Sequence, residues 1–124
     1  DAFEAAVAHQ SIPHGTTPEG CRILAIGPES VKAYVAIMAG ASTDVWKGPM
    51  GVLEFPVYGK ENSVIARAVA GSQAVSIIGG GESVAAIQQS GLADKITHIS
   101  TGGGASLEML EGLVLPGVAA LQDK

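Results

Sequence analysis

The chain has 124 residues, of which 47% are hydrophobic, 15% charged and 4% aromatic, and its formal net charge is −5. An acidic chain without a cluster of Lys and Arg lacks the basic, aromatic surface typical of nucleic-acid binders, so we expect no nucleic-acid partner. Its apolar runs are shorter than the roughly 18 residues of a membrane span, so we expect no membrane partner either.

Short apolar runs alternate with helical patterns along the sequence. Each run is rich in Val and Ile and mostly unalternating, which is typical of a parallel strand buried on both faces. The predicted strands are residues 22–26, 43–46, 74–78 and 96–99. The predicted helices are residues 29–39, 62–70, 82–89, 105–110 and 117–122, and a further helix is compatible with residues 2–9. This order predicts an α/β fold, a parallel sheet with helices on both faces in a Rossmann-like three-layer arrangement.

A glycine cluster follows each predicted strand. In a parallel sheet the carboxyl ends of the strands share one rim, and ligands bind there, so we expect the clusters to converge. Glycine lets a ligand approach the backbone, and the helix that follows directs free N–H groups at an anion such as phosphate. The alternative is that the glycines only form tight turns. The clusters are Gly27-Pro28, Gly48-Pro49, Gly79-Gly80-Gly81 and Gly102-Gly103-Gly104.

Two common nucleotide fingerprints are excluded by the sequence. A Walker A loop requires GxxxxGK followed by Ser or Thr, and no stretch has that spacing. The GxGxxG pattern fails at its last glycine in both triplet clusters, where Val84 and Leu107 stand. A phosphate site at these glycine loops would therefore be of neither the Walker A nor the GxGxxG type.

Several stretches strongly resemble phosphoglycerate kinase. They are WKGPMGVLEF at 46–55, IIGGGES at 77–83, GLADKITHISTGGGASLEMLEG at 91–112 and LPGVAAL at 115–121, with ILAIGPES at 23–30 matching more loosely. Their order is similar to the end of that family's nucleotide-binding domain. The resemblance implies that residues 1–124 are the carboxy-terminal part of this domain, a partial domain without the amino-terminal substrate domain. The rest of the parent chain would then be its partner, in an enzyme that the resemblance implies is monomeric.

The resemblance implies reversible phosphoryl transfer between 1,3-bisphosphoglycerate and Mg-ADP, which gives 3-phosphoglycerate and ATP. The isolated chain would be inactive and would supply the nucleotide-binding rim. In the matching positions Glu54 would bind the ribose hydroxyls, Leu24 would line the adenine pocket, and Pro49 would lie by the nucleotide. Glu82 would hold the magnesium ion. Backbone cradles for the phosphates and the transferred group would come from Gly79, Gly80, Gly81, Gly102, Gly103 and Gly104. Thr101, at a hinge and beside the phosphates in the family motif, would take part in catalysis, with a role in turn formation as the alternative.

Three site positions depart from the usual pattern of the family. Lys47 stands where an Asn usually lies by the nucleotide phosphates, and Glu82 stands in place of an Asp. Ile23 also replaces a small residue beside the adenine pocket. These departures leave a second reading open, a non-catalytic nucleotide-binding or interaction module derived from the same family. A third reading, an unrelated phosphosugar-binding α/β protein, is disfavoured by the specificity of the run at 91–106.

The remaining chemically reactive residues give no site of their own. His9, His14 and His98 have no partner at metal-ligand spacing, and Cys21 has no adjacent His that would make it a nucleophile. A single Cys cannot form an internal disulfide, which together with the missing signal-peptide pattern favours a cytoplasmic location. Trp46 ends a predicted buried strand and is expected in the core.

Overall fold

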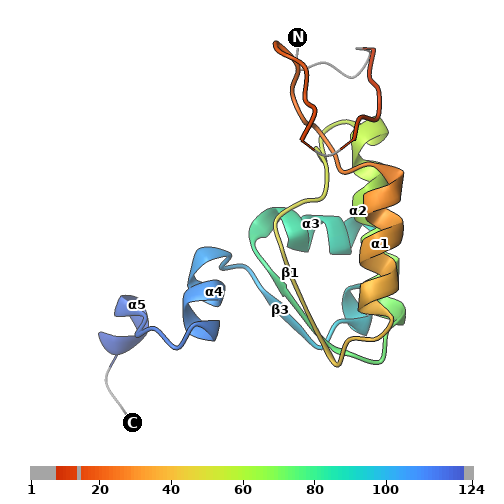
Figure 1. Ribbon diagram of the computed structural model, residues 1–124. Coiled ribbons are helices and arrows are strands. Elements are labelled where there is room, and N and C mark those ends of the chain that lie inside the picture. Colours follow the sequence, from red (N-terminus) through yellow and green to blue (C-terminus); the bar gives the residue numbers. More distant parts are fainter. Residues whose placement is uncertain (1–7, 14, 122–124) are drawn as a thin grey trace.

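Three parallel strands form the sheet at the centre of the computed structural model, which describes residues 8–13 and 15–121 (Figure 1). The strands are β1 (Thr43–Lys47), β2 (Val75–Gly79) and β3 (His98–Ser100), in the order β1-β2-β3. The register pairs Lys47 with Gly79 and Gly79 with Ser100. The carboxyl ends of the three strands are therefore level with one another.

The helices lie on both sides of this sheet. Figure 1 shows α1, α2 and α3 on one side of the strands, and α4 and α5 on the other. Their bounds are α1 Pro28–Met38, α2 Pro56–Gly71, α3 Gly81–Gln89, α4 Gly104–Leu110 and α5 Pro116–Ala119, with a 3₁₀ turn η1 at Ala93–Lys95. The predicted α/β fold with a parallel sheet is thus confirmed.

Proline sets the start of three helices. α1, α2 and α5 each begin with Pro at the first helical position, where its fixed φ suits the helix and its missing N–H costs nothing. α2 consequently begins at Pro56, earlier than the predicted residue 62. The extra turn adds Tyr58 to the buried side of α2.

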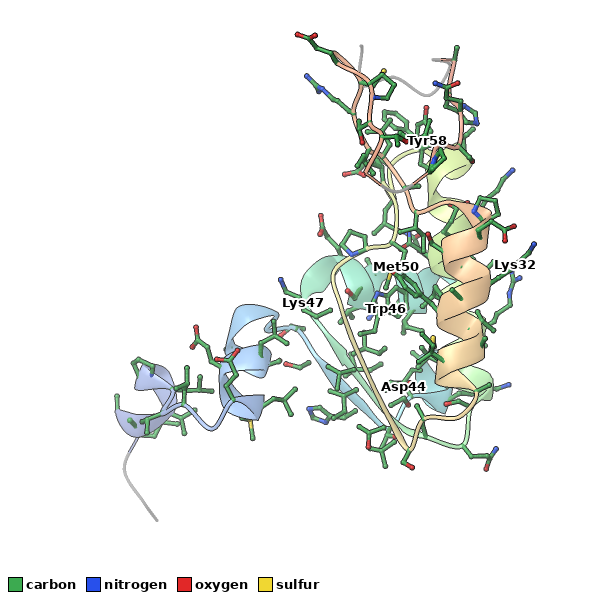
Figure 2. The ribbon with its side chains drawn as sticks, in the orientation of Figure 1. Lys32, Asp44, Trp46, Lys47, Met50 and Tyr58 are labelled. Atoms are coloured by element: carbon green, nitrogen blue, oxygen red, sulfur yellow. The ribbon has the colours of Figure 1, made fainter. Side chains whose placement is uncertain are left out.

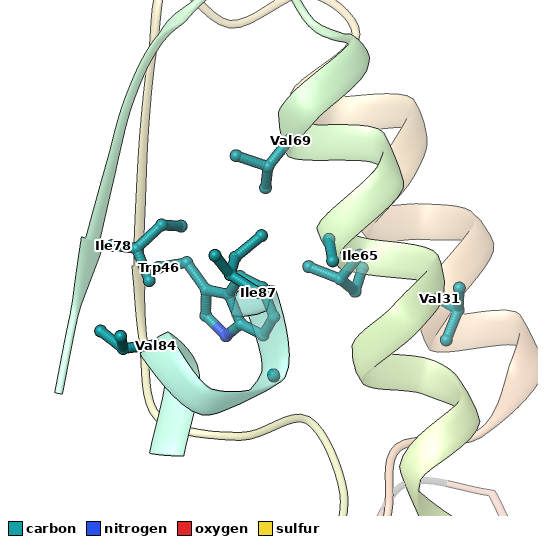
Figure 3. Packing of buried hydrophobic residues seen from close by; sticks show 9 residues of the cluster. Val31, Trp46, Ile65, Val69, Ile78, Val84 and Ile87 are labelled. Atoms are coloured by element: carbon teal, nitrogen blue, oxygen red, sulfur yellow. The ribbon is translucent and has the colours of Figure 1, made fainter. Parts of the chain in front are cut away.

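The core fills the space between the sheet and the first three helices (Figure 3). Trp46 and Ile78 come from the strands and are 3% and 0% exposed. Ile65 on α2 and Ile87 on α3 pack against them and are equally buried. Burial of each such apolar side chain contributes about 1.5–3 kcal/mol to the free energy of folding. The predicted core position of Trp46 is confirmed.

The predicted first strand, residues 22–26, is wrong. The segment makes one isolated antiparallel bridge, between Ala25 and Gly51, and does not join the sheet. Its backbone pairs instead with the loop after β1: the Ile26 N–H donates to the Met50 carbonyl, and the Val52 N–H donates to the Leu24 carbonyl, both at 2.9 Å. Because this apolar run has no neighbouring strand, its side chains do not form part of a face of the sheet.

Some predictions fall outside the described residues. They are most of the predicted helix at residues 2–9, His14, and residue 122 at the end of the last predicted helix. In the part of the chain that the structure does describe, the helices are all too short or too polar to cross a membrane.

Candidate functional site

The glycine loops after β2 and β3 lie side by side at the carboxyl end of the sheet. The N–H of Gly80 donates a 3.1 Å hydrogen bond to the carbonyl of Ser100 and so extends the pairing past the strands. A Cβ built on Gly103 would lie 3.3 Å from the Cα of Gly80, closer than most side chains tolerate. Gly80 itself has φ of 95°, in the region that favours glycine. These two positions require glycine for space and for backbone conformation.

Serine side chains fix the loop after β3. The N–H of Gly102 donates to Ser100 Oγ at 3.2 Å, and the hydroxyl of Ser106 donates to the Gly102 carbonyl and lies 2.9 Å from Ser100 Oγ. Thr101 is exposed in this loop, and so is Gly104 at the start of α4. Hydrogen bonds of Ser100 and Ser106 therefore fix the backbone of the predicted phosphate cradle, while Thr101 is exposed to solvent.

The loop after β1 is tied to the start of α3. The N–H of Gly48 donates a 2.7 Å hydrogen bond to Ser83 Oγ, and its carbonyl accepts a 2.6 Å bond from the Trp46 indole N–H. Gly48 has φ of 90°. Pro49 follows at once, so its position is set by a buried serine and a buried tryptophan. Of the four glycine clusters, the three that follow real strands meet at one rim.

A pocket of about 450 Å³ opens beside this rim. It contains the predicted adenine residue Leu24, the predicted nucleotide residue Pro49, and both predicted site acids, Glu54 and Glu82. Both carboxylates belong to exposed residues. The remaining lining residues are Ile23, Ala25, Ile26, Met50, Gly51, Val52 and Leu53. The structure thus brings together four residues from three separate stretches of the sequence.

Asn62 holds the inner wall of the pocket. Its side chain accepts a 2.7 Å hydrogen bond from the Met50 N–H and donates a 2.8 Å bond to the Gly51 carbonyl. It is 2% exposed. A Cβ on Gly51 would overlap the carbonyl oxygen of Tyr58 and lie 2.8 Å from the Cβ of Ala25, so the wall is packed against both of its neighbours.

The pocket and the glycine rim are adjacent parts of one site. Glu82 belongs to both, since it lines the pocket and follows Gly81 in the first turn of α3. Lys47 ends β1 on the rim and does not line this pocket. Figure 2 shows Lys47 beside the start of α3. An elongated ligand with an apolar end and an anionic end matches this layout.

Ser83, Asn62 and Ser106 are site-supporting residues that the sequence analysis missed. Each lies in a helix, and the hydrophobic pattern of a helix does not show which loop a polar side chain contacts. Ser83 and Asn62 form hydrogen bonds with the loop after β1, and Ser106 forms one with the loop before its own helix. The available signal was the position of Ser83 and Ser106, each of which is the second residue after a glycine triplet.

The carboxylates of the site do not form a metal centre by themselves. No group of three His, Cys, Asp or Glu suited to a metal ion occurs within residues 8–13 and 15–121. Mg²⁺ is commonly bound through one or two protein carboxylates together with substrate phosphates. Glu82, next to the glycine rim, fits that mode of binding.

Comparison with known proteins agrees with these features. The family model described as phosphoglycerate kinase matches residues 1–113. Phosphoglycerate kinase of Roseiflexus castenholzii is 56% identical over 99% of this chain, and the chloroplastic phosphoglycerate kinase of Chlamydomonas reinhardtii is 53% identical over 100%. The chain spans 31% and 28% of the lengths of these two relatives.

Solved structures give the same result. The crystal structure of phosphoglycerate kinase from Pyrococcus horikoshii superposes with a TM-score of 0.72 at 42% identity, over 82% of this chain and 25% of that one. The phosphoglycerate kinase from Coxiella burnetii gives 0.70 at 43% identity, over 78% and 25%.

Proposed function

This chain belongs to the phosphoglycerate kinase family, and from that premise we propose that it supplies the nucleotide-binding rim of a glycolytic kinase. The reaction is phosphoryl transfer between 1,3-bisphosphoglycerate and Mg-ADP, giving 3-phosphoglycerate and ATP. The observation that carries the proposal is that Leu24, Pro49, Glu54 and Glu82 line one common pocket beside the glycine rim. We propose that the rest of the parent chain brings the phosphoglycerate, and that the parent enzyme is monomeric and cytoplasmic.

In this proposal the two ends of the pocket hold different parts of the nucleotide. The base lies against Leu24 and Pro49, and the Glu54 carboxylate accepts hydrogen bonds from the ribose hydroxyls. Burial of an apolar base face and charge-assisted hydrogen bonds to a carboxylate are complementary sources of affinity. The diphosphate then extends toward Glu82 and the glycine loops.

The glycine rim binds the phosphates through its main chain. The first N–H groups of α3, at Gly81, Glu82 and Ser83, have no acceptor within their own helix, and in this proposal they donate to the phosphates. The glycines keep side chains out of the way where the two loops approach each other. Phosphoryl transfer depends mainly on such positioning and on charge neutralisation, so no general base is required of this chain.

Magnesium would enter as part of the nucleotide substrate, where it neutralises the developing charge on the phosphates. Glu82 is the residue of this chain that would hold it. Without a cation between them, the Glu82 carboxylate and the phosphates would repel each other, which favours the metal complex over the free nucleotide.

Calorimetric titration of the full-length protein that carries this chain tests the proposal. Micromolar binding of ADP that strengthens with Mg²⁺ is the expected result. A protein that binds no adenine nucleotide, with or without the metal, would contradict it.

A second candidate function is a nucleotide-binding module without catalysis. Lys47 and Glu82, which both depart from the usual family residues, favour this candidate. A coupled assay of ATP formation from 1,3-bisphosphoglycerate separates the two, because a module binds ADP and makes no ATP. The kinase predicts turnover in the full-length protein and none in the isolated chain.

A further inference from the structure

Lys47 lies against both glycine loops of the rim. The register pairs it with Gly79 at the end of the sheet. Its Cε lies 3.1 Å from the place where a Cβ on Gly103 would stand, and Gly80 Cα lies 3.3 Å from the same point. The Lys47 side chain therefore reaches the Gly103 loop at the point where that loop approaches Gly80.

The charge of Lys47 is not neutralised by a neighbouring carboxylate. Among the residues that the structure describes, the ion pair between Lys32 and Glu29 is the one that forms. Lys47 is exposed, and Glu82, in the first turn of α3, is not within ion-pair distance of it. Its ammonium group is therefore available to an anion at the glycine loops.

We propose that Lys47 determines which charge state of the nucleotide this site accepts, an inference that rests on the proposed function. An ammonium group and the Asn usual in the family can both donate hydrogen bonds to phosphate, but only the ammonium adds attraction that grows with phosphate charge. That charge is roughly −3 for free ADP and roughly −1 for Mg-ADP, so the attraction is about three times larger for the free nucleotide. Lys47 thus reduces the difference in affinity between metal-free ADP and Mg-ADP.

Lys47 and Glu82 act in opposite directions in this scheme. The Glu82 carboxylate repels a bare diphosphate and attracts one that carries a divalent cation, whereas Lys47 attracts both and attracts the bare diphosphate more strongly. Both residues are on the rim, on β1 and α3 respectively. The ratio of the two dissociation constants, without and with Mg²⁺, therefore reports on the balance between these two side chains.

Titration calorimetry of the full-length protein with ADP, in EDTA and in excess Mg²⁺, tests the inference. Lys47→Asn should weaken metal-free ADP by about eightfold and Mg-ADP by about twofold, since the two losses of free energy stand in the ratio of the charges. Lys47→Arg keeps the charge and should leave the ratio of dissociation constants close to the wild-type value. Lys32→Asn, which removes the same charge far from the rim, is the matched control and should change neither constant.

The outcomes separate the two proposals. Equal losses for both forms of ADP in Lys47→Asn, or no loss, would overturn the role of Lys47 while wild-type binding still supports the nucleotide site. A wild-type protein that binds ADP in neither condition would overturn the proposed function and this inference with it. The loss of affinity for metal-free ADP in Lys47→Asn should become smaller as the salt concentration is raised, because screening acts on the charge and not on the fold. That result would support the role of Lys47.

Discussion

The N–H of Gly48 donates a 2.7 Å hydrogen bond to the Oγ of Ser83, which joins the loop after β1 to the first turn of α3. The two residues are distant in the sequence, and Ser83 is completely buried. The bond sets the distance between the Pro49 side of the pocket and the Glu82 side. It is the cross-link through which the pocket and the glycine rim keep a common geometry.

Replacing Ser83 by Ala should loosen that cross-link. The Gly48 N–H loses its acceptor, and an unsatisfied donor at a partly buried position costs about 1–3 kcal/mol. We expect a matching loss of unfolding free energy in urea, together with weaker ADP binding. Ser90→Ala is the control at the other end of α3, since Ser90 follows the last residue of the helix and its hydroxyl donates to the Ile87 carbonyl. Equal ADP affinity in Ser83→Ala and the wild type would argue against a link to the site.

Asn62 should be indispensable for the inner wall of the pocket. Asn62→Asp keeps the acceptor for the Met50 N–H but loses the donor to the Gly51 carbonyl and places a negative charge opposite it. We expect a loss of about 2–4 kcal/mol in the unfolding free energy, because a buried partner is left unsatisfied and a charge is buried unpaired. Gln73→Ala, at an exposed position, is the control and should change little. A urea midpoint of Asn62→Asp equal to that of the wild type would contradict the prediction.

Gly51 and Gly71 form a matched pair of glycine substitutions. Gly51→Ala places a methyl group on the Tyr58 carbonyl oxygen and against Ala25, and neither backbone can withdraw without moving the pocket wall. We expect a loss of about 3 kcal/mol or more, as for other severe overpacking. Gly71→Ala, at the end of α2, has open space around it and should be neutral or stabilising by about 0.5 kcal/mol. Thermal unfolding of both variants measures the contrast, and similar melting temperatures would refute it.

Glu82 and Glu54 should respond differently to magnesium. Glu82→Gln should weaken Mg-ADP by about tenfold and leave metal-free ADP unchanged or stronger, because the carboxylate contributes on the order of 1.5 kcal/mol only when a cation is present. Glu54→Gln should weaken both forms to a similar degree, since the ribose hydroxyls are the same in each. Glu108→Gln, on α4, is the control. Titrations with and without the metal measure the difference, and a loss confined to Mg-ADP in Glu54→Gln would contradict the assigned roles.

The sequence predicted the parts of the fold whose pattern is local. Apolar runs rich in Val and Ile, each ended by glycine, located β1, β2 and β3 closely, and the family motifs indicated Leu24, Pro49, Glu54 and Glu82, which the fold then brings into one pocket. The run at residues 22–26 has the same composition and is not a strand. What decides its structure is its partner, the irregular loop at Met50 and Val52, and periodicity carries no information about partners.

Gly103 and Gly104 offer the sharpest test of the glycine rim, because they are adjacent and differ only in their surroundings. A methyl group on Gly103 would press on the Cε of Lys47 and on the Cα of Gly80, whereas one on Gly104 meets open space at the first residue of α4. We expect Gly103→Ala to weaken ADP by about tenfold or more, since a shift of the loop misplaces phosphate contacts worth about 1.5–3 kcal/mol each. Gly104→Ala should bind nearly as the wild type does. In a protein that already carries Lys47→Asn, the contact with the flexible side chain is relieved but the one with Gly80 is not, so Gly103→Ala should cost the same affinity relative to Lys47→Asn alone. Equal affinities of Lys47→Asn and the double variant would mean that Lys47, and not the approach of the two loops, sets the requirement for glycine at this position.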